Sequence, residues 1–142
     1  MPIVNFHLVE GLTTPAQDER LLIGACQLYA EVLKAPMERV RAFITLHKAT
    51  HFAVAGGLVA HNRLHAPYFD FIVLDGRSLE DRHRLMRGFT DLLVDTLGVR
   101  RDLVRGSCRR VEPQDWAIGG EPASVIRKEE VAARAAGSTP PP

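Results

Sequence analysis

A proline follows the initiator methionine, and its type and position suggest acid–base chemistry. If Met1 is removed, Pro2 carries a free secondary amine at the start of an apolar segment. An ordinary α-amino group titrates near about 7.7–8.0, and burial or nearby cations lower that pKa. The neutral amine could then act as a general base near neutral pH. Pro2 alone is a weak indication, because proline is also tolerated at the first residue of a strand.

Three arginines are candidates for binding an acidic substrate. Arg41 and Arg105 each follow a valine in equivalent predicted strands, and Arg77 lies at a strand-to-helix turn. A guanidinium binds a carboxylate in two-point geometry, stays protonated and stabilises a developing enolate. The alternative for each arginine is an ordinary solvated charge. Phe52 and Trp116 precede glycine pairs in the two halves and could line an apolar pocket, pack in the core or contact another subunit.

Other classes of function have little support in the sequence. The net charge is +1 with no long basic run, so we expect no nucleic-acid partner. No apolar run approaches the length of a membrane span, and the N-terminus lacks the features of a signal peptide, so we expect a cytoplasmic protein. Histidine pairs such as His47 and His51 lack accompanying cysteine or acidic ligands, so we expect neither a metal nor a cofactor.

Two halves of the chain show the same order of predicted elements. In the first half, Ile3–Val9 is a predicted strand, Thr14 begins a capping box for a helix that ends before Pro36, and residues 39–46 form a second strand. In the second half, Tyr68–Leu74 and residues 103–111 are strands, and a helix capped by Ser78 lies between them. Each half is therefore a predicted β-α-β unit.

Landmarks of the first half recur in the second at a nearly constant offset. Pro2 and Gly11, for example, recur 65 residues later as Pro67 and Gly76, which indicates a duplication. We predict an α+β fold with repeats at about 2–60 and 67–120, which form one four-stranded sheet with both helices on one face. Residues 1–127 form one predicted domain, and residues 128–142 a partly disordered tail. We expect the other sheet face to be apolar and covered by an oligomeric partner.

These residues resemble a known family. Residues 2–11 (PIVNFHLVEG) closely resemble the N-terminus of 4-oxalocrotonate tautomerase, and shorter matches extend the resemblance over residues 2–120. The resemblance implies two fused β-α-β units that assemble as a homotrimer. It also implies that Pro2 is the general base or acid, and that Arg41, Arg77 and Arg105 bind a small carboxylic acid. Phe52 and Trp116 would line the pocket, either in their own subunit or across a subunit boundary.

The departures from the family pattern limit these expectations. Leu12 stands where the family has an arginine, whereas the second half keeps that arginine as Arg77. Pro67 is internal, so its nitrogen is an amide and we expect one working site per chain, around Pro2.

The expected activity is keto–enol tautomerisation of a small 2-oxo or enol carboxylic acid. Two alternatives remain. In a related decarboxylase or hydrolytic dehalogenase, Glu38 would orient water, by resemblance to malonate semialdehyde decarboxylase. The other alternative is a non-catalytic oligomeric module that binds small acids.

Overall fold

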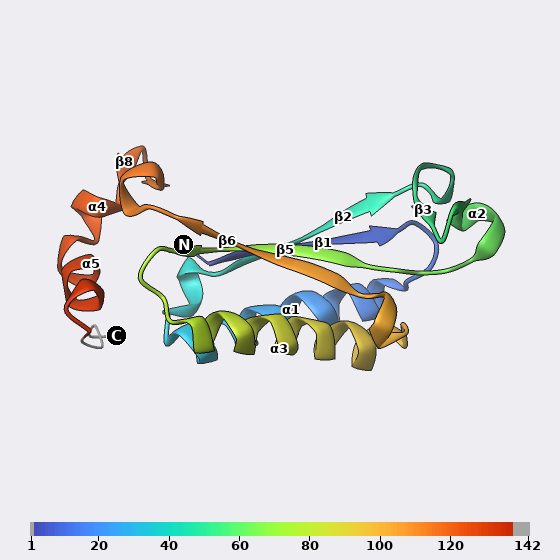
Figure 1. Cartoon of the computed structure of the whole chain (residues 1–142), viewed down its shortest axis with the longest axis horizontal. Coiled ribbons are helices and arrows are strands. Elements are labelled where there is room, and N and C mark those ends of the chain that lie inside the picture. Colours follow the sequence, from blue (N-terminus) through green and yellow to red (C-terminus); the bar gives the residue numbers. More distant parts are fainter. Residues whose placement is uncertain (1, 138–142) are drawn as a thin grey trace.

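The molecule consists of a four-stranded sheet with two long helices on one face and a short C-terminal arm at one end (Figure 1). The computed structural model describes residues 2–137. Its principal elements are β1 (Ile3–Val9), α1 (Pro15–Leu33), β2 (Arg41–His47), β5 (Tyr68–Leu74), α3 (Leu79–Leu97) and β6 (Arg105–Val111). The short elements are β3 (Ala53–Val54), β4 (Gly57–Leu58), α2 (Val59–Asn62), β7 (Ala117–Ile118), β8 (Glu121–Pro122), α4 (Ala123–Ile126) and α5 (Lys128–Ala135).

The sheet has the strand order β2-β1-β5-β6, and it joins two repeats along one antiparallel pair. β1 and β2 are parallel, β5 and β6 are parallel, and β1 meets β5 in antiparallel register with Ile3 opposite Ile72. The predicted α+β fold, with two β-α-β units and both helices on one face, is confirmed. The amino end of β1 and the carboxyl end of β5 therefore lie at the same end of the sheet.

The sequence signals for the long helices have the expected local structure. The Thr14 side chain accepts from the Gln17 amide, and Gln17 Oε1 accepts in return from the Thr14 amide. In the second repeat, Ser78 Oγ accepts from the Asp81 amide. The second strand of each repeat begins two residues later than predicted, at Arg41 and Arg105, because a turn of 3₁₀ helix precedes each of them.

An aromatic cluster fills the space between the sheet and the helices. Phe6, Phe69, Phe71 and Phe89 have no more than 1% exposure, and Tyr29 contacts two of these rings edge-on. The Tyr29 hydroxyl donates to main-chain carbonyls of Ile3 and Ile72, the residues that face one another across the β1–β5 junction. A residue of the first helix thus ties the two repeats together.

The open face of the sheet differs from the apolar surface expected from the sequence. Phe43 is 49% exposed there, but polar side chains occupy much of the same face. His7 Nδ1 lies 2.8 Å from His47 Nε2, and His7 Nε2 lies 3.3 Å from a carboxylate oxygen of Asp70. The expectation of a wholly apolar face was wrong because alternate residues of β1, β2 and β5 include histidine and aspartate at these positions.

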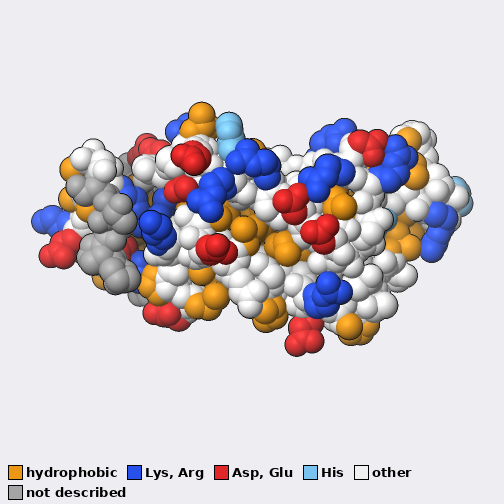
Figure 2. All heavy atoms as spheres, turned by 90° about the horizontal axis from the view of Figure 1, so that it is seen from below, with side chains coloured by type: hydrophobic (Ala, Val, Ile, Leu, Met, Phe, Trp, Pro, Cys, Tyr) orange, Lys and Arg blue, Asp and Glu red, His pale blue; other side chains and the backbone are white. Residues whose placement is uncertain are grey.

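The helix side has a different character. Figure 2, which looks onto this side, shows acidic and basic side chains scattered over the surface between smaller apolar areas. None of the helices in the described part of the chain is long and apolar enough to cross a membrane.

The C-terminal arm begins where β6 ends. β7, β8, α4 and α5 follow one another there and lie at the same end of the molecule as the chain's N-terminus (Figure 1). The expected boundary at residue 127 falls between α4 and α5. The segment 128–142 was expected to be a partly disordered tail; residues Lys128–Ala135 of it form α5, and its last five residues, 138–142, lie outside the described residues.

Candidate functional site

Pro2 lies in a crevice at the end of the sheet where β1 begins. It is buried, and its carbonyl oxygen accepts a 2.9 Å hydrogen bond from the Arg41 amide, which fixes the start of the strand. The crevice is lined by Pro2, Leu33, Ala35, Arg39, Val73, Leu74, Arg77, Glu130 and Arg134. Both repeats and the C-terminal arm therefore contribute to the surroundings of Pro2.

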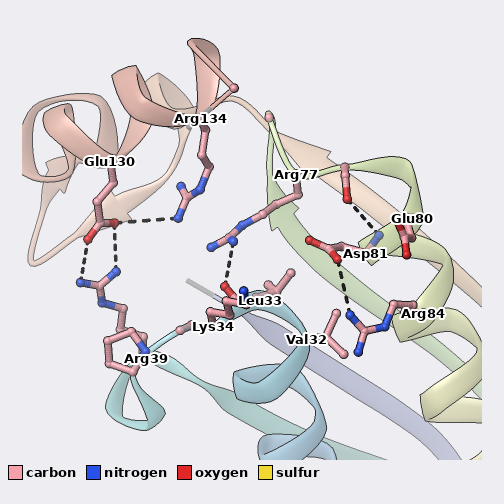
Figure 3. A pocket seen from close by; sticks show the side chains of 15 residues that line it. Val32, Leu33, Lys34, Arg39, Arg77, Glu80, Asp81, Arg84, Glu130 and Arg134 are labelled. Carbon is pink, nitrogen blue, oxygen red and sulfur yellow. Dashed lines mark hydrogen bonds and ion pairs between the residues drawn. The ribbon is translucent and has the colours of Figure 1, made fainter. Parts of the chain in front are cut away.

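A larger cavity of about 490 Å³ adjoins this crevice. Its walls include four charged residues that also line the crevice: Arg39, Arg77, Glu130 and Arg134. Figure 3 shows how these side chains converge from α5, from the turn before β2 and from the turn after β5. A volume of several hundred cubic ångströms is typical of a small-molecule site.

Arg77 comes from the turn between β5 and α3 and points into the cavity (Figure 3). Its Nη1 donates a 2.9 Å hydrogen bond to the carbonyl oxygen of Leu33 at the end of α1. Burial and the nearby positive charge of Arg134 lower the pKa of Arg77 to about 10. The guanidinium therefore keeps its charge at neutral pH.

Glu130 and Arg39 join the C-terminal arm to the body of the molecule. Both carboxylate oxygens of Glu130 accept 3.0 Å hydrogen bonds from the Arg39 guanidinium. Burial acts to raise the pKa of Glu130, but the hydrogen bonds and charge of Arg39 outweigh it and the pKa is lowered. Glu130 is thus an ionised partner inside an otherwise cationic cluster.

Of the residues expected at the site, the structure brings Pro2 and Arg77 together. Arg41 also lies at this end, but its guanidinium is exposed and donates to the main-chain carbonyls of Glu38 and Arg39. Glu38 is itself exposed and lines neither cavity. The water-orienting position expected for Glu38 is not formed within the single chain.

The other expected residues are spread over both ends of the sheet. Arg105 begins β6 beside Tyr68, and Phe52 follows β2, so both lie at the end opposite Pro2. Arg105 donates to the carbonyls of Asp102 and Val104, and Asp102 is the counterpart of Glu38, which accepts from Arg41 in the first repeat. Trp116 follows β6 and lies at the Pro2 end, although it lines neither cavity.

The replacement at Leu12 has a simple structural context. Leu12 follows the carboxyl end of β1, seven strand residues away from Pro2. Its counterpart Arg77 follows β5, and the antiparallel junction places that turn at the Pro2 end. Of the two equivalent positions in one chain, the one beside Pro2 keeps its arginine, Arg77, and the one at the far end of the sheet is Leu12.

Sequence reasoning missed Arg39, Glu130 and Arg134 as residues of the site. Nothing in the sequence singles out Arg39, and Glu130 and Arg134 fall in the segment 128–142 that was expected to be a tail. The spacing of Glu130 and Arg134 permits a pair on one helix face, but only the folded chain brings Arg39 to them. No group of three or more His, Cys, Asp or Glu residues in the described ranges is arranged to hold a metal ion.

Comparisons with known proteins agree with this architecture. A family model described as "Tautomerase enzyme" matches residues 2–62. The chain is 39% identical over 56 residues to 2-hydroxymuconate tautomerase of Pseudomonas sp. (strain CF600), covering 39% of this chain and 87% of the relative. It is 38% identical over 58 residues to probable tautomerase K2 of Dickeya dadantii (strain 3937), covering 41% of this chain and 87% of the relative.

Solved structures extend the likeness to nearly the whole molecule. Native fused 4-OT superposes with a TM-score of 0.81 at 22% identity, covering 88% of this chain and 98% of that chain. The Q0 fused 4-OT symmetric trimer gives 0.78 at 24% identity, covering 87% and 98%. These likenesses establish a fused, double β-α-β fold. The sequence relatives establish more: the chain belongs to the tautomerase family, and an isomerase activity of the tautomerase type is supported.

Proposed function

We propose that the protein is a tautomerase in which the Pro2 amine, freed by removal of Met1, transfers a proton within a small 2-oxo or enol carboxylic acid. The observation that carries this proposal is the crevice that Pro2 lines together with Arg39, Arg77 and Arg134. Nearby cations and apolar walls both favour the neutral amine. The named relative acts as a tautomerase of 2-hydroxymuconate, an enol acid of this class.

The proposed reaction needs only one mobile proton. The Pro2 nitrogen takes a proton from the enol hydroxyl or from a carbon beside the carbonyl, and the resulting dienolate is held by Arg77. The ammonium then returns the proton to a different carbon or to oxygen, so the amine is regenerated and no cofactor enters the balance. Cationic groups placed where negative charge develops lower the barrier to such a step.

The central test uses Pro2→Ala protein whose N-terminus is verified by mass spectrometry. Loss of the ring changes the amine from secondary to primary, and we expect kcat on 2-hydroxymuconate to fall by roughly 10²-fold or more, within the range expected for general acid–base catalysis. A second preparation that retains Met1 has an amide at Pro2 and should be inactive. Full activity in either preparation contradicts the proposed base.

We further propose that the chain forms a homotrimer through the open sheet face and the edge strands β2 and β6. Similar structures are described as trimers, and Phe43 leaves an apolar side chain half exposed on this face. Native mass spectrometry should give a mass of three chains, and Phe43→Glu should shift it toward one chain. Exposed Glu129→Gln is the matched control, and an unchanged trimer with Phe43→Glu contradicts the assigned interface.

Phe52, Arg41 and Arg105 are proposed to reach the Pro2 site of a neighbouring copy. Phe52 lies at the far end of its own sheet, so it cannot wall the crevice of its own chain. Mixing of Pro2→Ala and Phe52→Ala proteins under exchange conditions tests this arrangement. Recovery of activity above either parent supports a shared site, since some sites then combine an intact Pro2 and an intact Phe52. No recovery, despite proven subunit exchange, contradicts it.

Neither alternative activity has a specific structural observation in its favour. A hydrolytic or decarboxylating site would need an acid near Pro2 to orient water, and Glu38 is exposed outside both cavities. A non-catalytic module is less well supported because Pro2 adjoins a cavity. Assays with malonate semialdehyde and halogenated acrylates, with Glu38→Gln as the test variant, distinguish these activities from tautomerisation.

A further inference from the structure

Two arginines face one another across the cavity beside Pro2 with too little negative charge between them. Figure 3 shows the guanidiniums of Arg77, from the turn after β5, and Arg134, from α5, pointing toward the same space. The Arg134 side chain is only 11% exposed, and its Nε is buried with no hydrogen-bond partner among the described residues. Two cations at close range destabilise one another unless an anion lies between them.

The nearby acidic residues, Asp81 and Glu130, offset the charge of this pair only in part, because burial and the charge of Arg134 still lower the pKa of Arg77. Glu130 directs both oxygens to Arg39 at 3.0 Å and reaches Arg134 Nη2 only at 4.0 Å. The larger cavity as a whole is lined by five cationic and three anionic side chains, which leaves a surplus of two positive charges. Burial, and after it the charge of Arg134, lowers the pKa of Arg77, as expected when one buried guanidinium faces another.

We infer that Arg134 and Arg77 form a clamp for a carboxylate of the substrate, so that the C-terminal helix α5 is part of the substrate-binding site. This inference rests on the proposed function and assigns a binding residue outside the two repeats. A carboxylate has enough lone pairs to accept hydrogen bonds from both guanidiniums at once. Such an anion removes the repulsion between the two cations, and the surplus of two charges favours a dicarboxylate over a monocarboxylate.

Local structure holds Arg134 in position for this role. The Glu130–Arg39 pair anchors the preceding turn of α5 to the body of the molecule. The stem of Arg134 lies over Gly76, where an added Cβ would come within 3.6 Å of the Arg134 Cβ. Gly76 also has a φ of 108°, which a residue with a side chain rarely adopts. The turn that carries Arg77 thus packs directly against the helix that carries Arg134.

Calorimetric binding of muconate tests the clamp without turnover, because this dicarboxylate lacks the 2-hydroxyl group. We expect Arg134→Gln to weaken muconate binding by about 10- to 100-fold, in line with the loss of one charge-assisted hydrogen-bond pair. Arg134→Lys keeps the positive charge but lacks the planar guanidinium that donates two parallel hydrogen bonds, so it should weaken muconate binding by an intermediate factor. Lys128→Gln removes a charge from an exposed position of the same helix and should change binding less than about twofold.

A double-mutant cycle separates the clamp from a general charge effect. If both guanidiniums hold one carboxylate, Arg77→Gln and Arg134→Gln should be non-additive, and the double variant should bind little worse than either single variant. In steady state, Arg134→Gln should raise KM more than it lowers kcat. NMR spectra of α5 in each variant show whether the helix remains docked.

The outcomes distinguish this inference from the proposed function. Muconate binding by docked Arg134→Gln protein that equals that of the unmodified chain overturns the clamp, whatever the role of Pro2. A Pro2→Ala protein that binds muconate normally but does not turn over 2-hydroxymuconate supports the proposed base, and weak muconate binding by Arg134→Gln in addition supports the clamp. Full turnover by Pro2→Ala, together with weak binding by Arg134→Gln, overturns the proposed base and leaves the clamp supported.

Discussion

Arg39 and Glu130 lie 91 residues apart in the chain, and two contacts of 3.0 Å join the guanidinium of one to the carboxylate of the other. The side chains are 21% and 17% exposed, so water screens the pair only in part. Because this contact connects the turn before β2 with α5, it is a principal attachment of the C-terminal helix to the site.

Removing the Glu130 charge should loosen α5 without unfolding the sheet. We expect Glu130→Gln to weaken the docking of α5 by about 1–3 kcal/mol, the range for hydrogen bonds to charged groups. Hydrogen exchange at α5 amides should accelerate accordingly, while β1 and β5 keep their protection. Glu129→Gln, at an exposed position of the same helix, is the control. Unchanged exchange in the Glu130 variant contradicts the assigned attachment.

The same carboxylate predicts an acid-dependent docking of α5. Burial opposes ionisation of Glu130, but the hydrogen bonds and charge of Arg39 dominate and lower its pKa below the ordinary value of 4.5. The stabilisation is therefore present above 4.5 and is lost as the pH falls through the lowered value. NMR shifts of α5 followed from pH 6 downward should show undocking in this acidic window. Glu130→Gln should abolish the transition, and its persistence there would point to another group.

Tyr29→Phe should destabilise the junction between the repeats. The hydroxyl donates to carbonyl oxygens of Ile3 and Ile72, and its loss leaves buried acceptors short of a partner. We expect the free energy of unfolding to fall by about 1–2 kcal/mol, measured by urea denaturation. Tyr68 is 37% exposed and its hydroxyl bonds Ser107, so Tyr68→Phe should cost less than about 0.5 kcal/mol. An equal loss of unfolding free energy in the two variants would contradict a specific contribution of the Tyr29 hydroxyl to the β1–β5 junction.

Gly106→Ala should reveal how closely the Phe69 ring covers β6. A Cβ at residue 106 would lie 2.2 Å from Phe69 Cζ, and Phe69 is 1% exposed, so the ring has little room to move. We expect a loss of about 1–3 kcal/mol, as for other overpacked cores. The penalty should shrink in a Phe69→Leu background, because the contacting atom is then absent. An equal penalty in both backgrounds contradicts the steric explanation.

The layer architecture could be predicted from local sequence signals. Thr14 and Ser78 mark helix starts, Gly98 marks a helix end, and the β-branched runs from Ile3 and Tyr68 mark strands. These signals act over a few residues and recur in each repeat, so a single sequence reveals them. The details between them depend on tertiary contacts, as in the 3₁₀ turns that delay the start of β2 and β6.

The site was only partly predictable, because its charges come from three distant segments. Pro2 and Arg77 could be selected from the repeat and the family resemblance, but nothing local connects Arg39 with Glu130. Likewise, the pairing of His7 with His47 and Asp70 depends on strand register rather than on spacing along the chain. The position of α5 beside Pro2 could not be predicted from the sequence, because it depends on the antiparallel β1–β5 junction, which decides the end of the sheet at which α5 lies.

The places of Pro2 and Gly137, in a crevice and in the cavity that adjoins it, have a practical consequence for experiments. Pro2 lines the crevice, and Gly137, the last described residue, lines the larger cavity beside it. A purification tag fused ahead of Pro2 would therefore start at this crevice rather than on a remote surface. Recombinant protein that is cut to leave a native first residue, and that carries any tag in an internal surface loop, would avoid obstructing that crevice.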